Sequence, residues 1–590
     1  MKTFHISMWV AVLLLISACG ASTTGGVATT TSTTISGNAV AGAVNGTVSV
    51  LNTAGKVLTT ATVSNGAFSV TIPNSALSGE LIFEVTGTYT DEVSGNTVTL
   101  TAPNPLALRT AAAYFVAGAA GNAPITPDTT IINQLVVGGQ TLTQATTTFQ
   151  SVFGYAPDLS ARPFDPYTTT ITAQTQADKD AAFRVGLMSQ LGSNLGLSAA
   201  DLAEMPAKLA ADLADGTFDG IAGGNPVTFI SGVNLQVLNQ SKPLANQLSM
   251  SVAQFSSSSK NAAGVVAPSM GLPPIKGDRP GFTKTVALTD GTQLNVMLDV
   301  VYAAPFQTGF RSTKTTHKIT LTNTATNAPF DITAGGKVNR MMVMPLMYMN
   351  SGMNHTTPHS MVDTTQAAAG VYLVDMYYLM PSGMNNMPMG QWELTVQLGD
   401  TTSTNTMDPY ARQYFYPNVM MNMGTDLLIS KGSNILDTWT DMKGLTTPRE
   451  YRVWLHDIYA NAGGSHDLTV FISTRDMADM TMTMPMGGHG GMSFPPVYAG
   501  QTLHQALTGM TRPAKTVATV IVEASVDGGT TWNTMTSVKN MMMDTGKYQV
   551  IGLAGLTTGQ AATVSIRVTV DGNVMLDAGG NNPQLSFTAL

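Results

Sequence analysis

The chain has 590 residues and a mass of 61.7 kDa, which suggests three to five domains at about 100–200 residues each. Charged residues make up 11% of the sequence, against roughly 25% in an average globular protein, and the formal net charge is −8. These values exclude an electrostatic nucleic-acid binder and argue against a polybasic membrane-surface protein, since both need clustered lysine and arginine.

The first 19 residues have the organisation of a secretory signal. Lys2 precedes an uncharged apolar segment, residues 8–16, that is too short to span a bilayer. The sequence Ile16-Ser-Ala-Cys19 then resembles the bacterial lipobox, which implies cleavage before Cys19, acylation of that cysteine and membrane attachment. Gly20 follows, and in this family a residue other than aspartate favours an outer-membrane lipoprotein that faces the periplasm or the cell surface. An ordinary signal peptide with a chance cysteine is the alternative.

Residues 19–36 are small and polar and predict a flexible tether. Residues 37–105 alternate between apolar and polar side chains, with Asn65-Gly66 as a hairpin turn, and therefore predict β strands. The segment GAVNGTVSVLNTAGKVLTTATVSNGAFSVTI resembles transthyretin-like or carboxypeptidase-regulatory-like β-sandwich modules. That resemblance implies a spacer without activity of its own.

Residues 106–255 change to a helical period, with Phe183, Leu187 and Leu191 on one face. Ser198 and Asp201 have the spacing of a capping box, and Pro206 is expected at the first position of a following helix. We therefore predict a mainly helical subdomain, and a linker in the Ser-, Gly- and Pro-rich residues 256–280.

From residue 281 onward the alternation returns and predicts two further sandwiches, residues 281–404 and 405–590. The expected fold class is mainly β and multi-domain, with Ig-like or transthyretin-like sandwiches and a helical subdomain at about 106–260. Residues 525–532 match the Asp-box pattern S-x-D-x-G-x-T-W, and a single copy predicts a hairpin turn rather than an active site. We find no nucleophile elbow, zinc-protease helix or phosphate loop, and expect no enzyme.

Methionine is concentrated in one region, because 28 of the 36 methionines lie between residues 341 and 543. Thioether sulfur is a soft ligand that suits Cu(I), and imidazole is a borderline partner. Zinc, magnesium and calcium prefer other donors. A blue-copper site needs a cysteine ligand, and the one cysteine, Cys19, is at the predicted anchor. The composition therefore favours a Cu(I) site built from methionine and histidine.

Two regions supply the candidate ligands. The first contains Met344, Met347, Met349, Met353, His355 and His359, with Met380 and Met384 in a following loop, and the second contains Met482, Met484, Met486, His489 and Met492. If the first region is extended, Met347 and Met349 share a face. The alternation around residues 480–486 equally describes a half-buried core strand, because methionine is an adaptable core filler. Whether the two regions share a site stays open.

Three motifs carry a second resemblance: Met344-Pro-Leu-Met347-Tyr-Met349 with His355, Gly370-Val-Tyr372, and the segment from Met380 to Trp392. Together they resemble the YtkA-like (FixH-like) bacterial β-sandwich family over about residues 283–400. The resemblance implies a β-sandwich associated with copper handling in the cell envelope. This chain differs from the family pattern by extra methionine and asparagine between Met380 and Trp392, and by a histidine further from the methionine run.

The sequence thus predicts a lipid-anchored cell-envelope protein that binds Cu(I), or Ag(I), for buffering, delivery or resistance. Its expected partners are the membrane, through Cys19, and an envelope protein that exchanges metal. One alternative is a non-catalytic surface, adhesion or scaffold lipoprotein whose methionine-rich loops are contact surfaces. Another is oxidant scavenging by exposed methionines, since sulfoxide formation is reversible.

Overall fold

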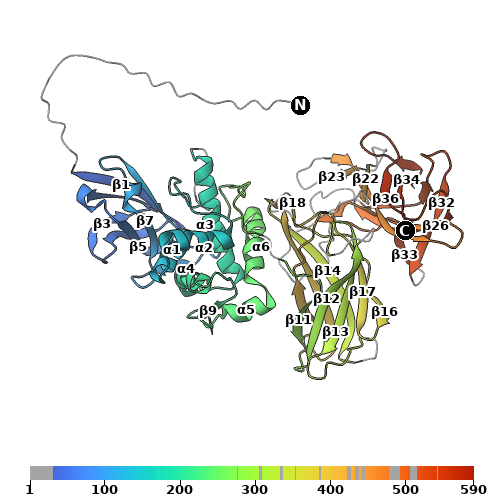
Figure 1. The fold of residues 1–590 in the computed structure, drawn as a ribbon, viewed down its shortest axis with the longest axis horizontal. Coiled ribbons are helices and arrows are strands. Elements are labelled where there is room, and N and C mark those ends of the chain that lie inside the picture. The colour runs from blue at the N-terminus through green and yellow to red at the C-terminus, as the bar shows by residue number, and fades with distance from the viewer. Residues whose placement is uncertain are drawn as a thin grey trace, which may run out of the picture.

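The structure is a computed structural model that describes residues 31–168, 171, 173–274, 277–303, 309–332, 336–351, 354–384, 387–421, 427–431, 438–440, 446–477, 492–504, 514–540 and 543–589. Strands hold 44% of the described residues and helices 17%, so the predicted mainly β, multi-domain class is confirmed. The parts of the chain follow one another along the long axis of the molecule (Figure 1). The predicted signal peptide and Cys19 lie outside the described residues.

The N-terminal part contains two small sheets. One has the order β4-β1-β8, and the other has the order β3-β2-β5-β6 with β7 paired to β5. The strands are β1 (Ser32–Ala39), β2 (Asn45–Asn52), β3 (Val57–Val63), β4 (Ala67–Pro73), β5 (Glu80–Thr90), β6 (Thr97–Leu100), β7 (Leu106–Ala111) and β8 (Gly121–Ile125). The prediction of a tether that extends to residue 36 is wrong, because β1 begins at Ser32 and buries Thr33 and Ile35 against its neighbours.

Six helices follow: α1 (Pro127–Val137), α2 (Leu142–Phe153), α3 (Gln176–Asn194), α4 (Ala199–Leu213), α5 (Leu235–Ser241) and α6 (Leu244–Ser257), with the short strands β9 (Ile221–Ala222) and β10 (Asn225–Pro226) between α4 and α5. The helical region begins at Pro127 rather than at 106, because the alternating residues before it form β7 and β8. The predicted capping box of Ser198 and Asp201 is confirmed at the start of α4. The prediction for Pro206 is wrong: α4 continues through it, and Leu209 and Leu213 anchor its second half in the core.

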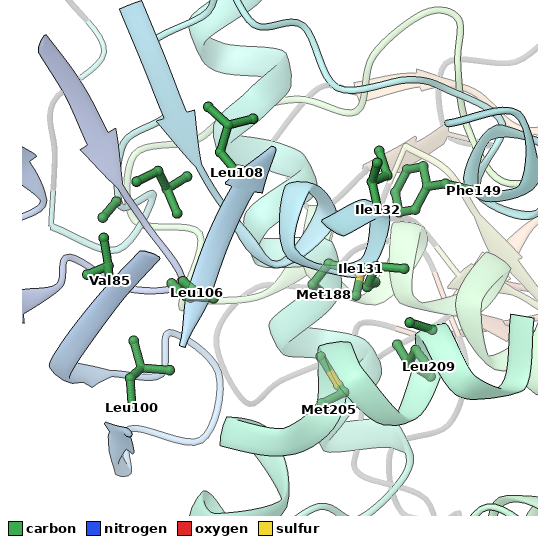
Figure 2. Packing of buried hydrophobic residues seen from close by; sticks show 14 of the residues in the cluster. Val85, Leu100, Leu106, Leu108, Ile131, Ile132, Phe149, Met188, Met205 and Leu209 are labelled. Atoms are coloured by element: carbon green, nitrogen blue, oxygen red, sulfur yellow. The ribbon is translucent and has the colours of Figure 1, made fainter. Parts of the chain in front are cut away.

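The N-terminal strands and the helices share one hydrophobic core. It joins strand residues such as Val85 and Leu106 to helix residues such as Ile131 and Met188 (Figure 2). The core also contains Val265 from the predicted linker, at 2% exposure. The linker prediction is therefore wrong for this stretch, which packs against the helices, and residues 31–274 form one folded unit.

The first C-terminal sandwich has two sheets, β11-β12-β13-β17-β16 and β21-β20-β14-β15-β28-β27. The first sheet contains β11 (Phe282–Ala287), β12 (Gln293–Ala303), β13 (Lys314–Asn323), β16 (Asp363–Ala368) and β17 (Val371–Tyr377). The second contains β14 (Val338–Met349), β15 (Asn354–His355), β20 (Gly390–Asp400), β21 (Tyr410–Phe415), β27 (Asp476–Met477) and β28 (Met492–Ser493); β18 (Gly383–Met384) and β19 (Met387–Pro388) form a separate hairpin. The core between the two sheets is built from buried hydrophobic side chains of both sheets.

The division predicted near residue 405 is wrong. β21, which lies beyond it, pairs with β20 through the register Leu394↔Phe415, and β27 and β28 extend the same sheet from still further along the chain. The first sandwich therefore includes residues to about 421 and receives two short strands from the region assigned to its neighbour.

The last part of the chain forms a nine-stranded sheet system in the order β22-β25-β26-β33-β32-β31-β34-β35, with β36 also paired to β34. Its strands are β22 (Leu427–Lys431), β25 (Glu450–Ala460), β26 (His466–Thr474), β31 (Val520–Ser525), β32 (Asn533–Asn540), β33 (Met543–Leu553), β34 (Ala561–Val570), β35 (Asn573–Met575) and β36 (Gln584–Thr588). Two short hairpins accompany it, formed by β23 (Thr438–Thr440) with β24 (Thr446–Pro448) and by β29 (Thr502–His504) with β30 (Ala514–Thr516).

Packed contacts join the parts. Helix α6 lies against the outer face of β14 and β20, where Met250 and Ala253 contact Tyr348 and Tyr416 (Figure 1).

The two C-terminal sandwiches meet through the rings of Tyr377, Trp454 and Phe471; the first and last of these stack at 4.1 Å. Beside them Asp375 of β17 lies 3.6 Å from Lys314 and 3.0 Å from Lys547 of β33. These lysines hold the pKa of the largely buried Asp375 carboxyl well below its usual range, despite the desolvation that opposes this.

Candidate methionine and histidine site

A row of methionine and histidine positions crosses four neighbouring strands of the first sandwich. Met347 of β14 pairs with His355 of β15, and His355 pairs with Met492 of β28. Met492 in turn pairs with Met477 of β27. Residues directly opposite each other on paired strands lie on the same face of a sheet. The register therefore brings methionines from two distant parts of the sequence to one row around His355.

The alternation of β14 sets which methionines face the core. Met341, Val343 and Met347 are buried, whereas Met344 on the alternate face is half-buried. Met347 has no exposed surface, and its methyl carbon would lie 3.0 Å from a Cβ added at Gly390, so the glycine leaves room for the thioether. The sequence folds this way because strand side chains alternate between faces.

The histidine is buried and neutral. His355 is 3% exposed, and its Nδ1 lies 2.8 Å from the carbonyl oxygen of Thr356. Because a carbonyl can only accept, Nδ1 carries the proton and Nε2 keeps its lone pair. Burial lowers the pKa of His355 to about 4, and the nearby charges of Arg452 and Arg475 act in the same direction.

Aromatic rings surround this imidazole. Trp392 of β20 is paired with Met347 and lies edge-on to His355 at 5.4 Å between ring centroids, and Phe494 lies at 6.2 Å. The indole Nε1 of Trp392 donates to the carbonyl of Met380 at 3.1 Å. The half-buried side chains of Met349, Met380 and Met389 pack against the same core. The site is therefore apolar and shielded, with soft or neutral donors inside it.

Several predicted ligands lie elsewhere. Met344 is on the opposite face of β14 from Met347, where its Sδ accepts from Nε2 of Gln397 at 3.0 Å. His359 is exposed and pairs with Met376, so it belongs to the other sheet. Met384 is 37% exposed in the β18–β19 hairpin.

For the remaining predicted ligands, the structure describes either the backbone alone or no atoms. The backbone of Met492 is described, whereas Met353, Met482, Met484, Met486 and His489 lie outside the described residues.

Two members of the site were not among the predicted ligands. Met477 reaches the row through the β27–β28 pairing, and Trp392 shields His355. Trp392 was visible in the sequence only as part of the Met380–Trp392 motif. The sequence places Met477 in the same methionine-rich region as Met492, but it does not predict the strand pairing that aligns the two residues.

The described residues offer no comparable set of ligands for metals such as zinc, magnesium or calcium. Within the ranges that the structure describes, no three histidine, cysteine, aspartate or glutamate side chains are placed to hold a metal ion. No helix in the same ranges is long and apolar enough to cross a membrane.

Family models, curated proteins and solved structures give no match to this chain. Its chemistry therefore has to be argued from the site itself. The described donors are the thioether of Met347 and the Nε2 lone pair of His355, with methionine at the next two register positions.

Proposed function

We propose that this chain is a lipid-anchored cell-envelope protein that binds Cu(I) at the row formed by Met347, His355 and Met492, and that it buffers copper or passes it to an envelope partner. The observation that supports the proposal best is the register that aligns these three positions on adjacent strands. The pairing aligns methionine positions that are far apart in sequence with the buried His355.

The donor chemistry supports a soft, monovalent ion. Thioether and imidazole are neutral ligands, and neither needs to lose a proton at neutral pH when the pKa of His355 is about 4. The hydrogen bond from Nδ1 to Thr356 orients the ring, as in metal sites where the second imidazole nitrogen is fixed by a carbonyl. Arg452 and Arg475 add positive charge nearby, which opposes a divalent ion more strongly than Cu(I).

The alternative of packing alone makes a different prediction. Methionine fills irregular cores well, so Met347 could be replaced by leucine at little cost in either case. Replacement by leucine removes the sulfur, and this should weaken Cu(I) binding only if the methionine is a metal ligand. Met341 is a matched control, because it is buried in the same strand and lies away from His355.

The experiment is an anaerobic competition between the full mature chain and a chromogenic Cu(I) chelator. We expect uptake of at least one equivalent, an affinity at least tenfold weaker in Met347→Leu and His355→Phe, and no change in Met341→Leu. Thermal unfolding of each variant checks that it folds. Failure of the wild-type chain to compete would refute Cu(I) binding. Equal affinities for Met347→Leu and Met341→Leu would refute this site.

The anchor is tested separately. We expect the chain to label with radioactive palmitate and to sediment with membranes when expressed in a bacterium, because acylation at Cys19 would hold it there. Cys19→Ser should abolish both. Sedimentation of the Cys19→Ser chain would contradict lipid anchoring and leave the copper proposal untouched.

A further inference from the structure

A polar cleft lies at the far end of the second C-terminal sandwich, on elements that the methionine and histidine row does not use. Its volume is about 590 Å³, within the range of roughly 300–1,000 Å³ typical of small-molecule sites. It opens between the β31–β32 turn, strand β34 and the loop that joins β35 to β36; its polar and aromatic lining comes from Trp532, Ser565, Asp577, Asn581, Asn582 and Gln584.

The first wall is held by the Asp-box turn that the sequence predicted. The Ser525 hydroxyl donates to Asp527 at 2.7 Å and accepts from the backbone N–H of Gly529 at 2.9 Å. Asp527 also accepts from the backbone N–H groups of Thr530 and Thr531. These bonds fix the turn that leads to Trp532.

One face of the Trp532 ring is already covered. The guanidinium of Arg567 lies 4.2 Å from the ring centroid, and its Nε donates to Glu523 at 2.6 Å. Arg567 is thereby held against the indole as a support and is paired with a carboxylate. The half-buried Trp532 ring lines the cleft as a rigid apolar platform.

The opposite wall is a tight loop in which not every polar atom has a hydrogen-bond partner. Oδ1 of Asp577 accepts from the backbone N–H groups of Gly579 and Asn581 at 2.8 and 2.9 Å. The buried Oδ1 of Asn582 has no hydrogen-bond partner among the described residues. The loop therefore presents fixed amide and carboxylate groups across from the indole.

This combination matches the surface of a sugar ring. The C–H faces of a pyranose are apolar and pack on an aromatic ring, whereas its hydroxyls both donate and accept hydrogen bonds. The lining contains no lysine, arginine or histidine, and its one charged group is the Asp577 carboxylate. An anionic sugar would meet repulsion there without a compensating cation.

We propose that the cleft binds neutral saccharides, through stacking on Trp532 and hydrogen bonds to Asp577, Asn582 and Gln584. The site would give the chain a glycan-recognition surface that is independent of metal binding. The proposal rests on different residues from the copper proposal, so either can fail without the other.

The test screens the full mature chain on an array of neutral and sialylated glycans, followed by calorimetric titration of the best ligand. We expect neutral glycans to bind. Trp532→Ala should weaken the best ligand at least tenfold, Trp532→Phe less, and Asn582→Ala severalfold. The exposed Gln560→Ala, outside the cleft, is the matched control and should bind as wild type.

Three results would overturn the proposal. They are the absence of any glycan bound at millimolar concentration, a preference for sialylated over neutral glycans, or equal affinity of Trp532→Ala and Gln560→Ala. Thermal unfolding of the variants shows whether a loss of binding comes from the cleft or from a loss of fold.

Discussion

Glu92 should make a large contribution to the pH dependence of the N-terminal unit. This side chain is 2% exposed and accepts a hydrogen bond from the backbone N–H of Gly42 at 2.9 Å through Oε1. Its Oε2 is buried with no partner among the described residues. Burial, together with the carboxylates of Asp91 and Asp165, raises the pKa of Glu92 to about 8 from 4.5.

The sign and size of the effect follow from linkage. Between pH 4.5 and 8 the folded chain keeps the proton on Glu92, whereas the unfolded chain releases it. The free energy of unfolding therefore falls as pH rises through this window and levels off above pH 8. At about 1.4 kcal/mol per pKa unit, the full change is on the order of 5 kcal/mol.

The perturbation is Glu92→Gln, which keeps the shape and removes the ionisation. Hydrogen exchange of core amides in β2 (Asn45–Asn52) and β5 (Glu80–Thr90), corrected for intrinsic rates, measures the opening free energy of this unit at pH 5, 6, 7 and 8. We expect the wild-type value to fall by several kcal/mol. The variant should fall less and be the more stable at pH 8, and its remaining slope should come from Asp128 and Asp212, whose pKa values burial raises to about 7 and about 6. Glu80→Gln, at the start of β5 and partly exposed, should keep the wild-type slope. An unchanged slope in Glu92→Gln would refute the reasoning.

Three further changes test other parts of the molecule. Asp375→Asn should lower the free energy of unfolding by about 3 kcal/mol, the low end for a broken buried ion pair, measured by urea denaturation, because Lys547 and Lys314 lose their shared carboxylate while Lys314 keeps Asp457 at 3.6 Å. Gly186→Ala should cost about 1–3 kcal/mol despite the better helix propensity of alanine, since the new Cβ would lie 2.0 Å from the Phe255 ring; a stabilised variant would contradict this packing. Burial lowers the pKa of His317 to about 3, so the unfolded chain takes up a proton first as pH falls from 6.5. Stability should fall over pH 6.5–3 in urea titrations, and it should fall less in His317→Gln, in which the buried His355 and His456 still contribute.

Local patterns predicted local structure well. The capping box at Ser198 and the buried face of Phe183, Leu187 and Leu191 depend on neighbours within two helical turns, and the structure has both. The shared face of Met347 and Met349 follows in the same way from strand alternation. Such features need no knowledge of distant parts of the chain.

The errors came where local composition and long-range pairing disagree. The predicted division near residue 405 falls in residues 401–409, which turn the chain from β20 into β21, with Asp400 accepting from Thr289 and Thr402. The Ser- and Thr-rich residues 32–36 look like a tether, yet they lie in β1, which pairs with β4 and β8 and buries Thr33 and Ile35. Threonine is compatible with strands, so a polar stretch can still be an inner strand.

The candidate metal site shows the same limit. Sequence named Met347, His355 and Met492 as ligands but left open whether the two methionine-rich regions share a site. It also grouped Met344 and His359 with them, although these residues lie on the opposite sheet face and on the other sheet. A register between strands far apart in sequence cannot be obtained from either strand alone.

The joined sandwiches give this row a physical advantage as a binding site. β27 and β28 leave the second sandwich and pair beside β15 of the first, so Met492 is beside His355 before any ion arrives. What keeps them there is an interface of stacked rings and the buried Asp375 network, both built without the row. Binding then loses less conformational entropy than it would if the ion had to gather the two segments itself. If the row binds Cu(I) as proposed, its affinity depends on an interface that its ligands do not touch, and release of the ion requires an opening of the shell that leaves Met347 0% and His355 3% exposed.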